Sequence, residues 1–562
     1  MEKIVFGIDL GTTYSAVSYV DSYDKPVIMK NRSGKDITPS AIYFSKEGNI
    51  VVGQVAKEEA DMDPTGYVEF FKRYMGTPFE ELPDSVKKKF TIGTKEYRPE
   101  ELSSLVLKEL KRSVDESSLG VKMEQVVITV PAYFNEAQRL ATKTAGELAG
   151  LQVLEIIKEP LAAAFDYTQN SGDDNRTFLI YDLGGGTFDA TVMSISEQEV
   201  IEVASEGDSQ LGGKDWDQRI FEFLYEKFIE EHPDYVFSPG DEKQLLLKAE
   251  EIKVRLTNSE TTKAKLNFDG KKSQPVITRQ DFEELTVDLL ERTLDITDEL
   301  INNSKAKGFK IDAILLVGGS TRMPMIKEAL QSKYGLEPKT HDPDQAVAKG
   351  AAIWAVFAYT KGQKIVEKLA SGELHEDSLT KEQKELLKNK DSFGEKLNTS
   401  VASFSNLSDK EIVTAATKTY GVKMIDKNDR PIIVNIIMKN TPLSGGYVTG
   451  KSKCYTLADS QELVEMKIYE SDETEEVVNY KDFMVEQLVG QVDLGLPVGL
   501  PKGSPLEVTL TLNDQGIINA YAKEETHGRD ASAEIHIKGL MTEKEMSDAV
   551  AHMNTLNIVD EI

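Results

Sequence analysis

A short phrase occurs twice in the sequence and constrains the fold more than any other feature. Residues 7–17 read GIDLGTTYSAV, and residues 180–192 read IYDLGGGTFDATV. In each copy an apolar strand ends at an aspartate, Asp9 or Asp182, and a tight turn of glycine and threonine follows. Backbone N–H groups in such a turn can face an anion at close range. The pair predicts a duplicated α/β lobe with a cleft between the copies, in which each lobe holds one side of a nucleotide triphosphate.

The two aspartates would face a metal ion in that cleft. Mg²⁺ prefers oxygen ligands and keeps several waters, which carboxylates can hold. One such loop alone is typical of an ordinary Gly-rich hairpin, and the occurrence of two loops in register disfavours that alternative. GDSQLGGKD, from 207 to 215, lacks the spacing and the Ser or Thr of a P-loop. GGGTFD leads into a strand rather than a helix, so a dinucleotide-binding fold is also disfavoured.

Length, charge and cysteine usage limit the class of protein. The 562 residues exceed what one hydrophobic core usually fills, so two or three domains are expected. The net charge of -29 argues against bulk binding to nucleic acid or to an anionic membrane. The single cysteine, Cys454, excludes an internal disulfide framework and favours a reducing compartment. The N-terminal run MEKIVFGIDL is too short for a signal or membrane-spanning segment, so we expect a cytoplasmic protein.

The chain divides into four segments of different texture. From 1 to 362, β-rich runs alternate with helical stretches, which is typical of α/β lobes with buried strands. From 363 to 410, acidic and basic residues interleave, which predicts a charged helical insertion and a linker. From 411 to 540 the hydrophobic period changes to two, as at Val464, Met466 and Ile468, and predicts an antiparallel β-domain. A short helical tail is expected from 541 to 562.

Several motifs together resemble one protein family. In order, they are GIDLGTTYSAV, VPAYFNEAQRLATKTAGELAGLQVLEIIKEPLAAAFDY, IYDLGGGTFDATV, LGGKDWD, LLVGGSTRMPMI and DPDQAVAKGAA, between residues 7 and 352. This series is similar to that of the seventy-kilodalton heat-shock chaperone family, whose bacterial members are DnaK-type proteins. The resemblance implies an α/β fold of duplicated actin-like (ribonuclease-H-like) ATPase lobes, followed by an antiparallel β-sandwich. The helical tail expected from 541 to 562 would add a short C-terminal helix to this fold.

The resemblance also implies roles for residues of the first half. Asp9, Glu159 and Asp182 resemble the carboxylates that hold a hydrated Mg²⁺ ion and the attacking water. Lys72 matches the lysine that reaches the γ-phosphate, and Thr187 completes the implied catalytic set. Residues that resemble the nucleotide contacts are Gly11, Thr12, Thr13, Tyr14, Gly184, Gly185, Gly186, Asp189, Gly213, Glu250, Lys253, Thr257, Gly318, Gly319, Ser320, Arg322 and Asp344. Pro131 and Arg139 resemble the family's proline switch and its relay arginine. The implied ligands are ATP or ADP and Mg²⁺, with K⁺ as a further candidate.

The second half resembles the family's substrate-binding β-sandwich through IIMKNTPLS, YTLADSQELVEMKIYESDE and the strands that follow LPKGSP. By that resemblance Val422, Tyr455, Val464 and Met466 would line a pocket for an extended apolar peptide. These residues are also what the core of any sandwich would contain, so that alternative stays open.

Three features depart from the family's pattern. The leucine-rich linker of the family is reduced here to Ile412 and Val413, which puts nucleotide-controlled coupling of the domains in doubt. Glu155 stands where DnaK-type members have an arginine that engages a J-domain partner, while Tyr133 and Asn135 remain. A reversed charge at Glu155 would repel that partner. Only residues 541–562 follow the β-domain, where the family carries a long helical lid, so fast peptide exchange is expected.

The main functional hypothesis is a slow ATPase that acts as a molecular chaperone and binds extended apolar segments of unfolded proteins. Its expected partners are such polypeptides and a nucleotide exchange factor. A J-domain cochaperone is a further candidate, although the Glu155 charge would repel it. The alternative is a nucleotide-dependent adaptor that recognises one folded partner through its β-domain. An actin-like filament former is the weakest candidate, because the β-domain argues against it.

Overall fold

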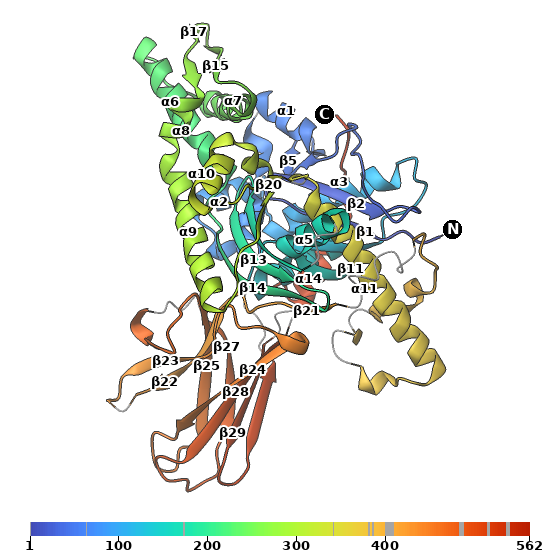
Figure 1. Ribbon diagram of the computed structural model, residues 1–562, viewed down its shortest axis with the longest axis vertical. Coiled ribbons are helices and arrows are strands. Elements are labelled where there is room, and N and C mark those ends of the chain that lie inside the picture. The colour runs from blue at the N-terminus through green and yellow to red at the C-terminus, as the bar shows by residue number, and fades with distance from the viewer. Residues whose placement is uncertain are drawn as a thin grey trace.

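The protein is described by a computed structural model that covers residues 2–62, 64–171, 175–340, 342–379, 383–384, 387–399, 410–426, 428–482, 488–513, 518–534 and 540–561. A large α/β body occupies the upper part of the molecule, and the orange and red strands of a β-sandwich hang below it (Figure 1). The body contains two mixed sheets. We call the part built on each sheet lobe I and lobe II.

The two sheets have corresponding strand orders. Lobe I has the order β11-β10-β1-β2-β3, with β4 paired to β2, and lobe II has the order β20-β19-β12-β13-β14-β21. In lobe I, β1 pairs in parallel with β10 and antiparallel with β2, and in lobe II, β12 pairs in parallel with β19 and antiparallel with β13. The bounds in lobe I are β1 (Phe6–Asp9), β2 (Tyr14–Val20), β3 (Pro26–Ile28), β4 (Thr38–Pro39), β10 (Gln125–Val130) and β11 (Gln152–Lys158). Those in lobe II are β12 (Arg176–Leu183), β13 (Phe188–Ile195), β14 (Glu199–Asp208), β19 (Ala313–Val317), β20 (Lys339–Thr340) and β21 (Glu411–Val413). The repeated phrase therefore forms the hairpins β1–β2 and β12–β13.

Helices cover these sheets. Those of lobe I are α1 (Gln54–Met62), α2 (Asp84–Phe90), α3 (Pro99–Asp115), α4 (Glu136–Leu148), α5 (Glu159–Ser171) and α11 (Ala346–Ser371). Those of lobe II are α6 (Gly213–Glu231), α7 (Pro239–Asn258), α8 (Arg279–Leu285), α9 (Val287–Ala306) and α10 (Pro324–Tyr334). Local sequence explains several starts: Asn135 caps α4 by accepting from the Gln138 N–H, and Ser238 caps α7 with Pro239 in its first turn. Helices α5 and α11 share one hydrophobic cluster with strands of both sheets, so the two lobes have a common core.

Smaller sheets complete the body. In lobe I they are β5 (Ala41–Phe44), β6 (Ile50–Val52) and β7 (Tyr67–Glu69), with β8 (Thr91–Ile92) and β9 (Lys95–Glu96). In lobe II they are β15 (Thr261–Lys263) with β18 (Val276–Thr278), and β16 (Leu266–Phe268) with β17 (Lys271–Ser273).

The charged insertion packs back on lobe I. Helix α11 continues through residue 362, where we expected the first domain to end, and reaches Ser371. The segment Leu387–Phe393 returns along it as a 3₁₀ helix, with the Phe393 ring 5.2 Å from that of Tyr359. Next, the Lys3 N–H donates to Lys396 O, and the Asn398 N–H donates to Lys3 O. Residues 380–382, 385–386 and 400–409 of the insertion lie outside the described residues.

The linker docks as a strand, although its apolar part is short. Strand β21 adds to the edge of lobe II by pairing in parallel with β14, Val200 opposite Ile412 and Ile201 opposite Val413. Val413 is buried. The short apolar segment put nucleotide-controlled coupling of the domains in doubt, and the structure shows that the segment nevertheless docks on lobe II.

Two antiparallel sheets form the sandwich. One has the order β26-β23-β22-β25-β27 and the other β24-β28-β29-β30. Their bounds are β22 (Thr419–Ile425), β23 (Pro431–Ile437), β24 (Tyr447–Tyr455), β25 (Leu463–Ser471), β26 (Val477–Asn479), β27 (Leu488–Gly495), β28 (Pro505–Asn513), β29 (Ile518–Glu524) and β30 (Asp530–Glu534). Burial alternates strictly along β28, so Leu506, Val508, Leu510 and Leu512 face the core, as expected for one face of a sandwich.

The tail returns to lobe I. Helix α14 (Glu543–Met553) buries Ala549 and Met553 in the lobe I core. Beyond it, the Val559 N–H donates to Ile50 O at 2.8 Å, beside a parallel bridge between Ile50 and Ile558. The C-terminal end thus lies near α1 and α3, at the opposite end of the molecule from the sandwich (Figure 1). Within the described ranges, no helix is both long and apolar enough to cross a membrane.

Candidate active site

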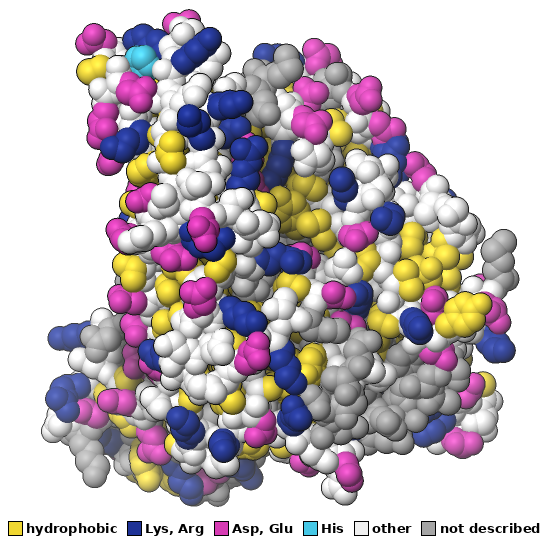
Figure 2. Space-filling model, turned by 45° about the horizontal axis from the view of Figure 1, so that its top comes forward, with side chains coloured by type: hydrophobic (Ala, Val, Ile, Leu, Met, Phe, Trp, Pro, Cys, Tyr) yellow, Lys and Arg dark blue, Asp and Glu magenta, His cyan; other side chains and the backbone are white. Residues whose placement is uncertain are grey.

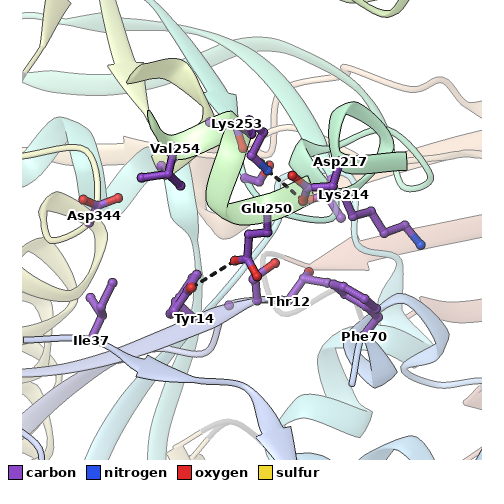
Figure 3. Close-up of a pocket in the computed structure, with 18 of the residues that line it drawn as sticks. Thr12, Tyr14, Ile37, Phe70, Lys214, Asp217, Glu250, Lys253, Val254 and Asp344 are labelled. Carbon is purple, nitrogen blue, oxygen red and sulfur yellow. Dashed lines mark hydrogen bonds and ion pairs between the residues drawn. The ribbon is translucent and has the colours of Figure 1, made fainter. Parts of the chain in front are cut away.

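A cavity of about 710 Å³ lies between the two lobes and brings the predicted site together. All of the predicted catalytic and nucleotide-contacting residues line it except Gly186, Asp189 and Gly213. Figure 3 shows side chains of both lobes converging on this space, with Thr12 and Tyr14 below and Glu250 and Lys253 above. The two copies of the repeated phrase therefore do face one cleft.

The two turns approach each other so closely that side chains would not fit between them. A Cβ on Gly185 would lie 1.8 Å from Thr13 Oγ1, and one on Gly186 would lie 2.3 Å from Thr12 Cγ2. The start of α6 adds to the second turn, because Gly213 N–H donates to Gly184 O at 2.9 Å. Among the described residues, the buried Thr13 Oγ1 has no hydrogen-bond partner. A phosphate oxygen would supply that partner.

Buried carboxylates surround one lysine beneath the turns. Lys72 Nζ lies 2.7 Å from Glu159 Oε1, and both side chains are buried. Burial, followed by the Glu159 charge, raises the pKa of Asp9 to about 7. The same two causes raise the pKa of Asp182 and of Asp189 well above the usual range of an aspartate. The Lys72 charge acts on Asp9, Asp182 and Asp189 but does not offset their burial and the repulsion from Glu159.

The donor set fits a hydrated Mg²⁺ ion rather than a directly chelated metal. No group of three or more His, Cys, Asp or Glu side chains in the described part of the chain could hold a metal ion by itself. Mg²⁺ usually keeps several waters and takes phosphate oxygens as ligands. Carboxylates that face the ion through water satisfy both observations.

The opposite end of the cavity is suited to a nucleoside. Lys253 Nζ donates to Gly213 O at 2.9 Å and pairs with Asp217 at 2.8 Å. Arg322 pairs with Asp344, and Ser320 Oγ donates to Gly184 O. Val254, with 59% of its surface exposed, offers an apolar face toward the same space (Figure 3). Gly318 has a φ of 82°, which a residue with a side chain rarely adopts, where the chain passes Asp182.

Comparison with known proteins agrees with these features. A sequence model of the Hsp70 protein family matches residues 5–390. The chaperone protein DnaK of Thermotoga petrophila is 33% identical over 561 residues, which covers 97% of this chain and 82% of that protein. DnaK of Thermotoga sp. strain RQ2 gives the same values.

The chain belongs to the Hsp70 family. It is accordingly an ATP-dependent molecular chaperone with ATPase activity, and it binds nucleotide. The alternative of a dedicated adaptor for one folded partner is not favoured by these relatives. The expected fold class is confirmed as far as a mixed α/β ATPase part with a β-sandwich.

Arg139, which resembles the family's relay arginine, lines a small cavity together with residues of the linker and the sandwich, among them Ala415 and Tyr420. Pro131 ends β10, and Arg139 on α4 donates to Ile156 O at 3.1 Å. Beside them, Lys158 forms a buried ion pair with Glu202 at 2.8 Å and donates to Ala415 O in the linker. Lys158 of lobe I therefore contacts both lobe II and the linker.

Glu155 is held by the residues of α11. Its Oε2 accepts from Trp354 Nε1 at 2.6 Å, and Lys361 Nζ lies 3.8 Å from Oε1. The expected repulsion of a J-domain partner thus concerns a carboxylate that already has a hydrogen bond and a neighbouring cation.

The four predicted pocket residues do not form one surface. Val422 and Met466 are buried in the sandwich core, Val464 packs against that core, and Tyr455 has 57% of its surface exposed. In this conformation Val422 and Met466 pack against residues of the second sheet in the core. This agrees with the alternative, stated above, that they are ordinary core residues of a sandwich.

Several residues that line the cavity were missed. The charged and aromatic ones at its mouth include Lys57, Glu69, Phe70, Lys89, Lys214 and Lys243. Lys214 lies inside the LGGKDWD motif, so its charge beside a glycine turn was a usable signal. The others gave none, because they reach the cavity only through the closure of the two lobes.

Proposed function

We propose that the cleft hydrolyses ATP with the residues predicted from the motifs, and that the sandwich binds extended apolar peptide segments with an affinity that the nucleotide controls. The observation that carries this proposal is the group of buried carboxylates around Lys72, placed beside two glycine- and threonine-rich turns that approach each other closely. This arrangement suits a triphosphate with a hydrated Mg²⁺ ion, held through water by Asp9, Glu159 and Asp182. The matching strand pairings also support the inference of an internal duplication of actin-like lobes.

Each protein group has a role in this proposal. Mg²⁺, when bound, supplies positive charge to the phosphate oxygens. The backbone N–H groups of the two turns and Thr13 Oγ1 bind phosphate oxygens. Lys72, oriented by Glu159, places its ammonium at the transferred phosphoryl group and orients water. Glu250 and Lys253 border the nucleoside.

The docked linker supports control of peptide binding by nucleotide. Strand β21 extends the lobe II sheet whose β12–β13 turn would hold the phosphates, so a movement of lobe II on nucleotide exchange would also move the linker. Pro131 and Arg139 are proposed to pass the change from lobe I. A J-domain cochaperone and a nucleotide exchange factor remain proposed partners, and a cytoplasmic location agrees with the single cysteine.

The first test is steady-state ATP turnover with and without a panel of apolar peptides, for the wild type and for Lys72→Ala. Loss of one preorganised charged group at such a site costs about 100- to 1,000-fold in rate, so the variant should lose turnover and keep nucleotide affinity. Peptides should raise the Lys72-dependent rate of the wild type. Turnover that survives in Lys72→Ala would contradict the site, and turnover that no peptide changes would contradict the coupling.

A further inference from the structure

Cationic side chains gather at the mouth of the nucleotide cleft. Dark blue Lys and Arg side chains surround the hollow between the two upper parts of the molecule (Figure 2). Lys57 and Lys89 come from lobe I, and Lys214 and Lys243 come from lobe II. All four line the same cavity as the phosphate turns.

Most basic groups that cross the mouth have an acidic partner on the other lobe. Lys57 Nζ lies 3.0 Å from Glu250, and Lys243 Nζ lies 2.7 Å from Glu69. Arg73 of lobe I lies 3.3 Å from Asp215 of lobe II. In each pair the two charges neutralise each other, and the pair connects the two lobes.

Lys214 differs from these groups. Among the described residues its ammonium has no ion pair or hydrogen bond, and it lies 5.1 Å from the centre of the Phe70 ring across the cleft. Figure 3 shows Lys214 and Phe70 reaching toward each other from the two lobes. Burial, then the positive charge of Arg73, lowers the pKa of Lys214 to about 8. The nearby Asp215, Lys89 and Glu69 also affect that pKa, and Asp215 and Glu69 already have basic partners.

Phe70 has a strained backbone at this place. Its φ is 62° and its ψ is 18°, which is the left-handed region that a bulky residue rarely adopts. Phe70 directly precedes the short helix Phe71–Tyr74, which carries Lys72. Strain of this kind persists where the surrounding contacts hold it, and it is concentrated at functional sites. The contact between the ring and Lys214 is one such contact.

We propose that Lys214, with Lys89, forms a second anion site at the mouth of the cleft, which takes the inorganic phosphate product on its way out. This inference rests on the proposed ATP hydrolysis and names the residues of its product step. With no anion present, the Phe70 ring provides a cation–π partner for the ammonium. A phosphate dianion is a stronger partner, because it pairs with the full charge and accepts hydrogen bonds. The backbone N–H of Lys214 donates to Gly185 O, so Lys214 directly adjoins the turn that would hold the phosphates.

The test measures binding of radiolabelled inorganic phosphate to the ADP-loaded chain by equilibrium dialysis, which needs no turnover. Loss of a charged hydrogen bond predicts that Lys214→Gln weakens phosphate binding by about tenfold. Lys214→Arg, which keeps the charge, should restore binding. Lys243→Gln is the matched control, because it removes a cation of the same mouth that Glu69 already neutralises. Thermal unfolding checks that each variant is folded.

The outcomes separate the sources of the anion. Phosphate binding that is equal in the wild type and Lys214→Gln overturns the proposal, and so does a wild type that binds no phosphate. If Lys214→Gln instead weakens binding of a non-hydrolysable ATP analogue and leaves phosphate binding intact, Lys214 contacts the γ-phosphate of the nucleotide and the product site is wrong. Because dialysis is independent of hydrolysis, a failed ATPase assay would not be mistaken for any of these results.

Discussion

At the scale of single residues, the proposed phosphate site depends on glycines, which carry no Cβ atom. The first turn fills the space that a Cβ on Gly185 would need, whereas a Cβ on Gly184 would lie no closer than 3.6 Å to Thr187 O. Two adjacent glycines of one motif therefore have different roles. Gly185 permits the approach of the two lobes, and Gly184 contributes its carbonyl to Gly213 and Ser320.

This difference predicts a large effect for one alanine variant and almost none for the other. Gly185→Ala should separate the turns and weaken ATP binding by about 10- to 100-fold, since overpacking costs about 1–3 kcal/mol. Gly184→Ala should bind ATP within about threefold of the wild type, because its methyl group meets only ordinary contacts. Isothermal titration with ATP and Mg²⁺ measures both. Equal affinities would show that the turns separate freely on binding.

Motifs predicted the residues of the turns, because each proposed phosphate contact lies in or beside a glycine-containing local motif. They could not predict Phe70 or its contact with Lys214. The left-handed backbone of Phe70 has no local signature in FFKRYMG, and its partner is more than a hundred positions away in the chain. Residues that act across the cleft are defined by the closure of the lobes, which no local pattern encodes.

At the scale of elements, the C-terminal helix belongs to lobe I rather than to the sandwich that precedes it. Met553 has none of its surface exposed and packs in the core of lobe I. Lys108 Nζ donates to Met553 O, and Arg112 Nη1 donates to Ile558 O. Asp560 pairs with both Arg112 and Arg32. Sequence texture predicted a short helix here, but its docking depends on a groove that lobe I forms only when folded.

Truncation of one side chain tests this docking. Met553→Ala should lower the free energy of unfolding of lobe I by about 2–5 kcal/mol, the usual cost of emptying a buried methionine site. The neighbouring Asn554 is exposed, and Asn554→Ala should change the same quantity by less than about 0.5 kcal/mol. Urea denaturation of the full chain with ADP measures both. Equal midpoints for the two variants would mean that α14 does not contribute to the stability of lobe I.

At the scale of the whole molecule, lobe I and the sandwich meet through buried carboxylates. Asn135 Nδ2 donates to Glu470 on β25 at 2.8 Å, and Glu136 lies beside it at the start of α4. The residues of such contacts are separated by as many as 335 positions in the chain, so the sequence predicted both domains but not how they meet. Burial raises the pKa of Glu136 to about 8, because it disfavours the charged form of the carboxyl. The Arg139 charge lowers this pKa, and the Glu470 charge opposes that lowering. Burial also raises the pKa of Glu470.

These shifts predict that docking of the sandwich weakens as the pH rises. Undocking exposes Glu136 and returns its pKa toward the ordinary 4.5, so the docked state holds a proton that the undocked state releases. The contribution to docking is therefore fully present below the ordinary pKa and is lost as the pH rises toward 8, by at most about tenfold per pH unit for one group. Among the described residues, the other charged or titratable groups at this contact include Arg139, Lys143, Lys158, Lys418, Tyr420, Lys439 and Asp472.

Hydrogen exchange of the β21 amides between pH 5.5 and 8, corrected for the intrinsic pH dependence of exchange, reports release of the linker from β14, which we expect to accompany release of the sandwich because the linker leads directly into it. Protection should fall with rising pH in the wild type. Glu136→Gln keeps the size of the side chain and cannot release a proton, so its protection should vary less with pH and exceed that of the wild type near pH 8. A Gln variant with the same slope as the wild type would place the pH dependence on other groups and remove Glu136 from the control of docking.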